Sequence, residues 1–420
     1  MDKELYGRYL GVLREELVPA LGCTEPVTVA YAAALARKTL GYFPEKLVAK
    51  CSGNIIKNVK SVVVPNSGGQ TGIAAAAILG AIAGNADKAL EVLSDVPEDK
   101  ISLSKRLVDQ RLCEVRLAEG VANLYVSVTA FAKGEFATVD IEDKHTNIVK
   151  IEKNGETLFS KEASEKKEYD RSFMSVEGIL DFAEAININD VRELLDRQMA
   201  CNKKISDEGL KNHYGAGIGR RMLEIYGDTL NSRACAKAAA GSDARMNGCD
   251  LPVVINSGSG NQGITVTLPV VEYAEELGAG MDMTYRALAV SNLVAIHIKS
   301  GIGSLSAFCG AISASSGCGA AITYLRGGTR LQIAKSISNT LGIMAGVVCD
   351  GAKASCAGKI AQGVQCAILA SGMALDNDDL NWGDGILGDD IEGTIKNIAR
   401  MGRQGMKSTD VEILNIMIGN

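Results

Sequence analysis

The sequence predicts an α+β fold, in which a mainly helical domain is interrupted by a smaller inserted α+β domain. This expectation rests on two changes of composition along the 420 residues. Residues 1–85 are apolar and rich in glycine and alanine, residues 86–205 are dense in charge, and the residues that follow are again apolar and small. We therefore expect residues 1–85 and 206–420 to form the helical domain and residues 86–205 to form the insertion.

The first expected element is an amphipathic helix over residues 1–17. It carries charges throughout and lacks the apolar centre of a signal peptide. This pattern predicts a cytoplasmic protein, in which disulfides are rare. The eleven cysteines are then expected to be buried thiols or metal ligands.

Two uncharged stretches, residues 66–86 and 305–325, have the length of a membrane span, which is roughly 20 residues. Alanine, glycine and serine predominate in both, and these residues insert into lipid less favourably than leucine and phenylalanine. We expect both stretches to be buried helices of a soluble core. A non-catalytic membrane protein is the alternative.

Residues 113–155 carry the pattern of strands. Apolar and polar residues alternate between turn residues, which predicts strands over 113–120, 123–133, 135–143 and 147–155. Apolar residues then recur at helical spacing, which predicts helices over 176–185 and 188–200.

The charge pattern excludes one class of partner. The net charge is -6, charges of both signs are interspersed, and only 5% of the residues are aromatic. Nucleic-acid recognition needs a basic face or aromatic stacking platforms, so a nucleic acid is not expected as a partner. A membrane is not expected either, because the two uncharged stretches are rich in alanine, glycine and serine. The sequence does not exclude a homodimer.

Two glycine-rich turns, within residues 62–73 and 252–264, repeat one pattern: an apolar run, Asn-Ser-Gly, then Gln and Gly-Ile opening an apolar helix. Backbone amides at such a helix start favour an anion, such as a carboxylate; ordinary helix starts are the alternative. A dinucleotide fingerprint over 258–263 is not expected, because no clear second strand follows. The candidate substrate-binding residues are Asn66, Ser67, Gln70, Asn256, Ser257 and Gln262.

The chain has only three histidines, so a histidine-based zinc site is poorly supplied. His297 and Lys299 form an ionisable pair near the end of an apolar helix, and we consider both as weaker substrate-binding candidates.

Five cysteines fall within 58 residues, and two of them bound the motif "CDGAKASC", Cys349 to Cys356. On a straight helix these two would lie about 10 Å apart along the axis, but Gly351 allows a turn that brings them together. Asp350 and Lys353 need partners if they are buried. A soft metal centre suits such a cluster; core packing and a nucleophilic role for Cys356 are the alternatives.

These residues resemble the L-cysteine desulfidase family, which is related to the iron–sulfur L-serine dehydratases. The resemblance is carried by "CDGAKASC", by "FCGAISASSGCGAA" upstream of it, and by "LGCTEP" near the N-terminus. It extends over essentially the whole chain and includes "VPNSGGQTGIAAAAILGA", "HTNIVKIEKNG", "LPVVINSGSGNQGI" and "TDVEILNIMIGN".

The resemblance implies a 4Fe–4S cluster in the helical domain, which would then be the catalytic one. The implied ligands are Cys309, Cys349 and Cys356. Cys318 corresponds to a residue that is not a ligand in the relatives, and the fourth iron is open to substrate. The serine dehydratases are thought to fill that position with a C-terminal cysteine, whereas this chain ends in "MIGN". Here Cys23 of "GCTEP" is the candidate to occupy the open position on the fourth iron. It stands at roughly the place of a Ser-His-Thr motif that this segment lacks.

The expected reaction is a non-redox β-elimination of L-cysteine to pyruvate, ammonia and hydrogen sulfide. Cys23 is the first candidate base and Glu25 the second. L-serine dehydration by the same cluster is the alternative within the family. A pyridoxal-phosphate lyase would instead need a Schiff-base lysine, for which Lys353 or Lys299 is available. From another class, a non-catalytic iron–sulfur carrier is the alternative.

Overall fold

A computed structural model describes residues 1–161, 170–303 and 305–419. The helices are α1 (Lys3–Glu16), α2 (Thr24–Leu40), α3 (Gly53–Val59), α4 (Ile73–Ala83), the 3₁₀ helix η1 (Ala86–Glu91), α5 (Glu98–Asp109), α6 (Val176–Ala185), α7 (Ile188–Lys211), α8 (Ile218–Tyr226), α9 (Leu230–Met246), α10 (Gly260–Glu276), α11 (Met281–Ile302), α12 (Gly310–Leu325), α13 (Arg330–Met344), α14 (Ser355–Asp376), α15 (Ile391–Arg400), the π-helical turn η2 (Met401–Gly405) and α16 (Lys407–Ile418).

The strands form one sheet of six and one of two within the described residues. The larger sheet has the order β3-β2-β4-β5-β6-β7, in which only β2 and β3 run parallel. The smaller sheet pairs β1 with β8 in antiparallel fashion. The bounds are β1 (Pro19–Leu21), β2 (Lys46–Cys51), β3 (Cys113–Leu117), β4 (Tyr125–Ala132), β5 (Glu135–Glu142), β6 (Ile148–Lys153), β7 (Glu156–Ser160) and β8 (Pro252–Val254).

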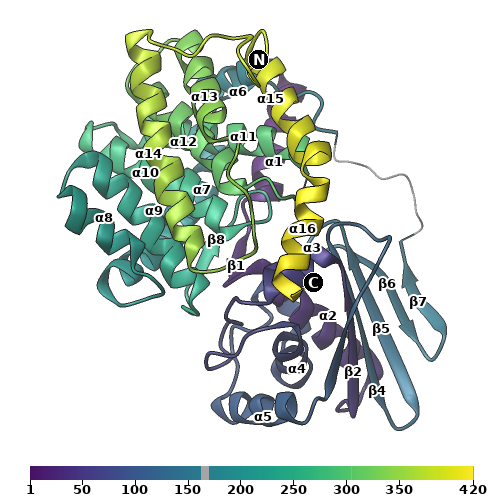
Figure 1. The fold of residues 1–420 in the computed structure, drawn as a ribbon. Coiled ribbons are helices and arrows are strands. Elements are labelled where there is room, and N and C mark those ends of the chain that lie inside the picture. The colour runs from purple at the N-terminus through teal and green to yellow at the C-terminus, as the bar shows by residue number, and fades with distance from the viewer. Residues whose placement is uncertain (162–169, 304, 420) are drawn as a thin grey trace.

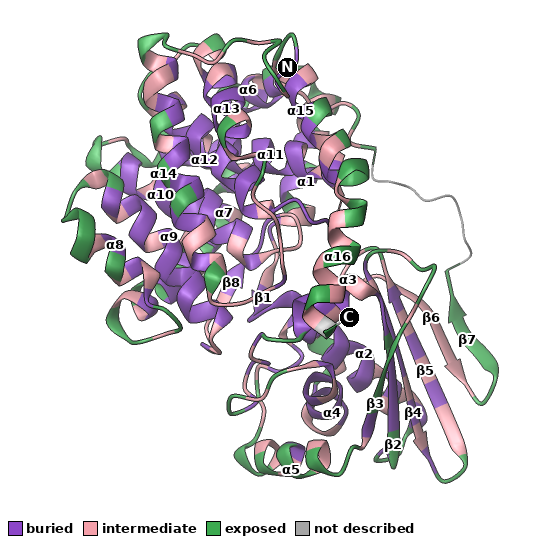
Figure 2. Cartoon of the chain, viewed as in Figure 1, coloured by how far each residue is buried: buried purple, intermediate pink, exposed green. Residues whose placement is uncertain are grey.

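The α+β class is confirmed, with a mainly helical body and a smaller sheet region beside it (Figure 1). Helix α2 packs on β4 and β5. Every second residue of β5, namely Ala137, Val139 and Ile141, is buried, as the period of two for a half-covered sheet requires. The outer strand β7 is exposed (Figure 2). The C-terminal helix α16 runs down from the helical body to α3, beside the sheet (Figure 1).

Small residues let the buried helices approach closely. A Cβ at Gly80 of α4 would lie 2.2 Å from the carbonyl oxygen of Ala30 in α2, and one at Gly317 of α12 would lie 2.2 Å from that of Ser291 in α11. Both uncharged stretches therefore contribute helices to the core, as the sequence predicts. Among the described residues, no helix is both long enough and apolar enough to cross a membrane.

Most elements predicted from the pattern are present. The four predicted strands correspond to β3–β6, and the three predicted helices to α1, α6 and the first part of α7. The domain limits at residues 85 and 205 stay a prediction. Two observations bear on them: β2, which precedes residue 86, lies inside the six-stranded sheet, and α7 packs on α9 and α10 of the helical body.

The close contact of α2 and α4 can be tested with Gly80→Ala. The added methyl group meets backbone rather than a movable side chain, so we expect the free energy of unfolding to fall by about 1–3 kcal/mol. The matched control is Gly11→Ala on α1, where a Cβ meets nothing within 4 Å. That variant should gain about 0.5–1 kcal/mol from helix propensity. Urea denaturation measures both, and equal effects would contradict the packing argument.

Candidate functional site

Two of the three cysteines expected to bind iron lie side by side because their backbones pair. The N–H of Cys309 donates to the carbonyl of Val347 (3.1 Å), and the N–H of Cys349 donates to the carbonyl of Ala307 (2.6 Å). A short antiparallel bridge joins the two segments between these bonds. Cys309 is also the N-cap residue of α12, so its position is fixed by both the bridge and the helix.

The third cysteine follows a turn at Gly351, as the sequence predicts. Gly351 has φ +95°, and a Cβ there would lie 2.5 Å from the carbonyl oxygen of Lys57. Glycine is therefore required for both conformation and space. Because the chain turns here, α14 begins only at Ser355, and Cys356 lies in its first turn. The segment from Cys349 to Cys356 is thus not a straight helix.

The three thiols influence one another's ionisation. Burial, and after it the charge of Cys349, raises the pKa of Cys309 to about 12, with a smaller contribution from Cys356. Burial also raises the pKa of Cys356, and the charge of Cys349 adds to this effect. Thiolates at these positions consequently need positive charge nearby.

Two lysines supply positive charge beside the thiols. Nζ of Lys359 donates to Oδ1 of Asp350 (2.5 Å), and its charge lowers the pKa of Cys309 against the effect of burial. Lys299 is buried near the end of α11. Burial lowers the pKa of Lys299 to about 8, while the charges of Cys349 and Cys309 oppose that fall.

The charged residues inside "CDGAKASC" have the partners that the sequence argument requires. Asp350 lies 2.5 Å from Nζ of Lys353 and 2.5 Å from Nζ of Lys359. Burial raises the pKa of Asp350, but the hydrogen bonds from Lys353 and Lys359 outweigh it and lower the pKa to about 2. This network holds the loop that carries the second and third cysteines.

The donor set fits an iron–sulfur cluster better than a single ion. Within the part of the chain that the structure describes, no group of three or more His, Cys, Asp or Glu side chains could hold one metal ion. Cys309, Cys349 and Cys356 are nevertheless free thiols, and the segments of the first two pair with each other while the charges of all three interact. Iron–sulfur clusters are held by cysteine thiolates, each on its own iron, so these thiols need not converge on one point.

A second buried group lies at the N-terminus of α2. The thiol of Cys23 donates to Oε2 of Glu25 (2.9 Å), and Nδ2 of Asn58 donates to Oε1 (2.8 Å). The hydroxyl of Thr24 donates to Oε2 as well (3.1 Å). Burial, and after it the charge of Glu25, raises the pKa of Cys23 well above its ordinary value. Burial also raises the pKa of Glu25, but His145 and the bond from Cys23 outweigh it, so the carboxyl pKa is lowered.

The structure brings the candidate base and a candidate cluster ligand together. Cys23, Val62 and Met246 form a small buried apolar cluster, and Ala352 and Cys356 pack against it. The "GCTEP" and "CDGAKASC" segments, which are distant in sequence, therefore meet at one place.

His145 joins the same place and was not predicted from the sequence. It lies between β5 and β6, and its Nδ1 is 2.9 Å from the hydroxyl of Thr28 on α2. Burial lowers the pKa of His145, while the charge of Glu25 opposes that effect. The "GCTEP" segment has no histidine of its own, and the sheet region supplies one. The only sequence signal was the "HTNIV" segment within the family resemblance, which gave no hint of this contact.

The polar side chains of the first glycine-rich turn form hydrogen bonds to other groups of the protein. Asn66 donates to the carbonyl of Leu93 (2.7 Å), Ser67 accepts from the N–H of Gln70 (2.9 Å), and Gln70 accepts from Ser104 (3.2 Å). Val62, at the start of this loop, is the part that reaches Cys23. A substrate role for Asn66, Ser67 and Gln70 stays a prediction.

The second turn divides into two parts. Asn256 donates to Oδ1 of Asn292 (3.0 Å) and accepts from Ser257 (2.9 Å), which makes both part of a buried polar network. Gln262 instead lies against the start of α12, since a Cβ at Gly310 would be 2.8 Å from its Cδ. Of these three, Gln262 thus adjoins Cys309, a candidate cluster ligand.

His297 and Lys299 lie in different surroundings although they are two residues apart. Nε2 of His297 is 2.8 Å from Oε2 of Glu392 on α15, whereas Lys299 is near enough to Cys309 and Cys349 for their charges to act on its pKa. The structure therefore brings Lys299, but not His297, to the cysteines.

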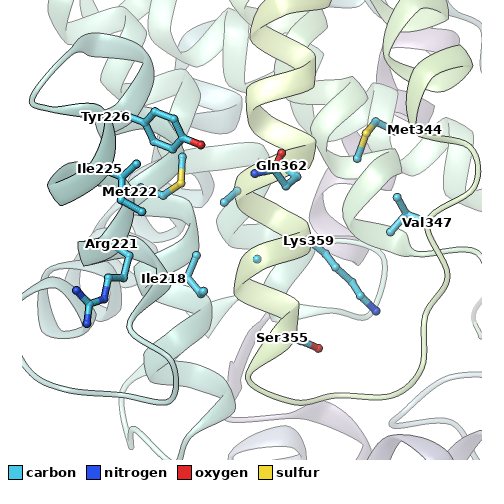
Figure 3. A pocket seen from close by; sticks show the side chains of 12 residues that line it. Ile218, Arg221, Met222, Ile225, Tyr226, Met344, Val347, Ser355, Lys359 and Gln362 are labelled. Carbon is cyan, nitrogen blue, oxygen red and sulfur yellow. The ribbon is translucent and has the colours of Figure 1, made fainter.

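An apolar hollow of about 710 Å³ lies between α8 and α14 (Figure 3). Its lining includes Met222, Tyr226 and Val347. The stem of Lys359 also lines it, while the ammonium of Lys359 binds the carbonyl of Val348 (2.8 Å) and Asp350. The hollow therefore adjoins the segment that carries Cys349 and Cys356.

Comparison with known proteins identifies a family and several related chains. Residues 87–415 match the family model described as serine dehydratase alpha chain. A UPF0597 protein of Desulfitobacterium hafniense (strain Y51) is 50% identical over 416 residues, which cover 98% of this chain and 97% of that protein. UPF0597 proteins of Lachnoclostridium phytofermentans (48% over 417 residues; 99% and 100% covered) and Bacteroides fragilis strain ATCC 25285 (38% over 416 residues; 97% and 97% covered) are also similar.

A buried ion pair ties α16 to the cysteine loop and yields a prediction. Nζ of Lys57 lies 2.5 Å from Oδ1 of Asp410 and 3.3 Å from the carbonyl of Cys349. The Lys57 side chain is 2% exposed. Asp410→Asn leaves this charge without its carboxylate, so we expect the free energy of unfolding to fall by about 3–5 kcal/mol.

Two variants control for this effect. Replacing both partners, Lys57→Met with Asp410→Leu, should restore most of the lost stability, because no buried charge is left alone. Glu275→Gln breaks the exposed pair with Lys203 and should cost less than about 1 kcal/mol. Guanidinium denaturation compares all three, and a double variant no more stable than Asp410→Asn would refute the pairing argument.

Proposed function

The chain belongs to the serine dehydratase alpha chain family, and from this premise we propose that it is a lyase that acts on L-cysteine. The reaction is a non-redox β-elimination: one L-cysteine and one water give pyruvate, ammonia and hydrogen sulfide. The observation that supports the proposal is that Cys356, one of the three free candidate cysteines, packs against the apolar cluster of Cys23, which is bonded to Glu25.

Cys309, Cys349 and Cys356 are the proposed ligands of a 4Fe–4S cluster. Such a cluster, when bound, supplies an open iron that acts as a Lewis acid toward the leaving group. The chain's own contribution is to hold three thiols on rigid segments. Lys359 and Lys299 then balance the negative charge of the thiolates.

Removal of the Cα proton is assigned to Cys23 and Glu25 acting as a pair. Glu25 is the ionised member, and Cys23 the protonated one that donates to it over 2.9 Å. As Cys23 accepts the proton from Cα, it passes its own proton to Glu25, so the pair takes up one proton and no free thiolate has to form. Burial of both groups keeps water out of this step.

L-serine is the second candidate substrate, and the family match favours it. The elimination would be the same except that hydroxide, not hydrosulfide, leaves Cβ. Parallel assays of pyruvate, ammonia and hydrogen sulfide from the two amino acids separate the candidates. Turnover of neither amino acid by iron-loaded protein would favour a non-catalytic iron–sulfur carrier. A sharp internal-aldimine band would favour the pyridoxal-phosphate alternative.

The ligand assignment predicts a pattern of iron loss. Cys309→Ser, Cys349→Ser and Cys356→Ser should each lower the iron content after anaerobic reconstitution from about four atoms per chain, because thiolates are the ligands that iron–sulfur clusters require. The matched control is Cys318→Ser, a buried thiol further along α12, which should keep its iron. Full iron in the Cys356 variant together with loss of turnover would instead make Cys356 a catalytic nucleophile.

The base assignment predicts the opposite pattern. Glu25→Gln and Cys23→Ser should lower kcat by about 10²–10⁴, the usual contribution of a general base, while iron content stays at the wild-type level. Solvent-deuterium exchange at Cα, followed by NMR on unreacted substrate, should slow in parallel. Unchanged exchange in both variants would move the base elsewhere. Cys51→Ser, which replaces a buried thiol in β2, controls for the loss of a core cysteine.

A further inference from the structure

Arg245, on the last turn of α9, is buried without a full set of partners. The residue is 2% exposed. One nitrogen, Nη1, donates to Oδ1 of Asn261 (3.1 Å), whereas neither Nε nor Nη2 has a hydrogen-bond partner among the described residues. A buried guanidinium in this condition is costly to the fold. It is also the group that binds carboxylates best, through two parallel N–H donors.

The same guanidinium lies against the start of α10. A Cβ at Gly260, the first residue of that helix, would be 2.3 Å from Nε of Arg245. Within the described residues, this 17-residue helix receives no side-chain capping bond from its N-cap Ser259. Its first backbone N–H groups and its dipole therefore add to the positive potential of Arg245. An anion at this point would meet donors from both the side chain and the helix.

Two buried carbonyl oxygens nearby have no hydrogen-bond partner within the described chain. They are Oδ1 of Asn58 and Oε1 of Gln262. Asn58 is held by its own bond to Glu25, and Gln262 follows Asn261, the partner of Arg245. Amide oxygens of this kind accept from an ammonium group.

These groups share one neighbourhood with the proposed reaction centre. The charge of Arg245 acts on the ionisation of both Cys23 and Glu25. The next residue, Met246, packs with Cys23 in the apolar cluster that Cys356 covers. Gln262 touches the start of α12 beside Cys309.

We propose that Arg245 binds the carboxylate of a zwitterionic L-α-amino acid, while Asn58 and Gln262 accept from its ammonium group. Electrostatics agree with such a ligand, since the site already holds one buried cation, Arg245, and one buried anion, Glu25. A zwitterion adds no net charge to this pair, whereas a simple carboxylic acid or a simple amine would. Which side chain the amino-acid ligand carries rests on the proposed function. Binding of the ligand can nevertheless be tested without turnover.

The experiment measures binding of L-alanine, which has no leaving group, by isothermal titration calorimetry. The full chain is used both as purified and after anaerobic reconstitution. Propionate and ethylamine serve as the carboxylate-only and ammonium-only probes, and sodium sulfate as the inorganic anion. Three variants are compared with wild type: Arg245→Met, Arg245→Lys and Arg233→Met. Arg233 is the matched control because it lies on the same helix but is paired with Glu272 and Glu276.

We expect wild type to bind L-alanine more tightly than propionate or ethylamine. Arg245→Met should weaken L-alanine binding about 100-fold or more, since two charge-assisted hydrogen bonds are lost, and Arg245→Lys should weaken it less. Arg233→Met should bind as wild type does. Arg245→Met should also unfold at a temperature no lower than wild type, because it removes an incompletely paired buried charge. If Arg245 had only a structural role, Arg245→Met would instead unfold at a lower temperature than wild type.

The outcomes separate this inference from the proposed function. Arg245-dependent L-alanine binding without turnover of cysteine or serine would support the ligand site and reject the reaction. Turnover with L-alanine binding equal in wild type and Arg245→Met would reject the ligand site alone. Arg245-dependent binding of sulfate that L-alanine does not displace would make Arg245 an inorganic-anion site and overturn the proposal.

Discussion

The arrangement of the site depends on one buried carboxylate, that of Glu25. It accepts from Cys23 and Thr24 on its own helix start and from Asn58 on α3. Thr24 is also 3.0 Å from the carbonyl of Gly258, in the turn that precedes α10. The first turn of α2 thus joins α3 to the helical body. A buried anion is tolerated only when hydrogen bonds and nearby positive charge compensate it, so these elements are held in one relative position.

Close backbone approach is the second constraint. Glycine at position 351 admits the carbonyl of Lys57, and glycine at position 260 admits the guanidinium of Arg245. In both places a Cβ would clash with a group beside the candidate site. The small-residue runs that imitate membrane spans act in the same way, because they let α4 pack closely on α2 and α12 pack closely on α11.

Local pattern predicted the elements, but it could not predict their contacts. Alternation revealed β3–β6, whereas β2 lies in a glycine- and alanine-rich segment and is defined by its pairing with strands far along the chain. Within the site, the resemblance indicated the cysteines, and the structure adds the bridge between Cys309 and Cys349. His145 and Arg245 were missed because neither has a local motif. Each becomes recognisable only when the fold buries it beside Glu25.

The buried polar groups of this interior differ in whether their hydrogen bonds are complete. The network of Asn256, Asn292 and Gln198 is closed by mutual hydrogen bonds and behaves as core. Arg245, by contrast, has two nitrogens without a hydrogen-bond partner in the described part of the chain. Its charge acts on the pKa of Glu25, yet the two form no ion pair among these residues. A chain selected only for stability would pair or remove such a charge. This incomplete set of partners is the physical reason to propose ligand recognition there, since a bound carboxylate would supply the missing acceptors.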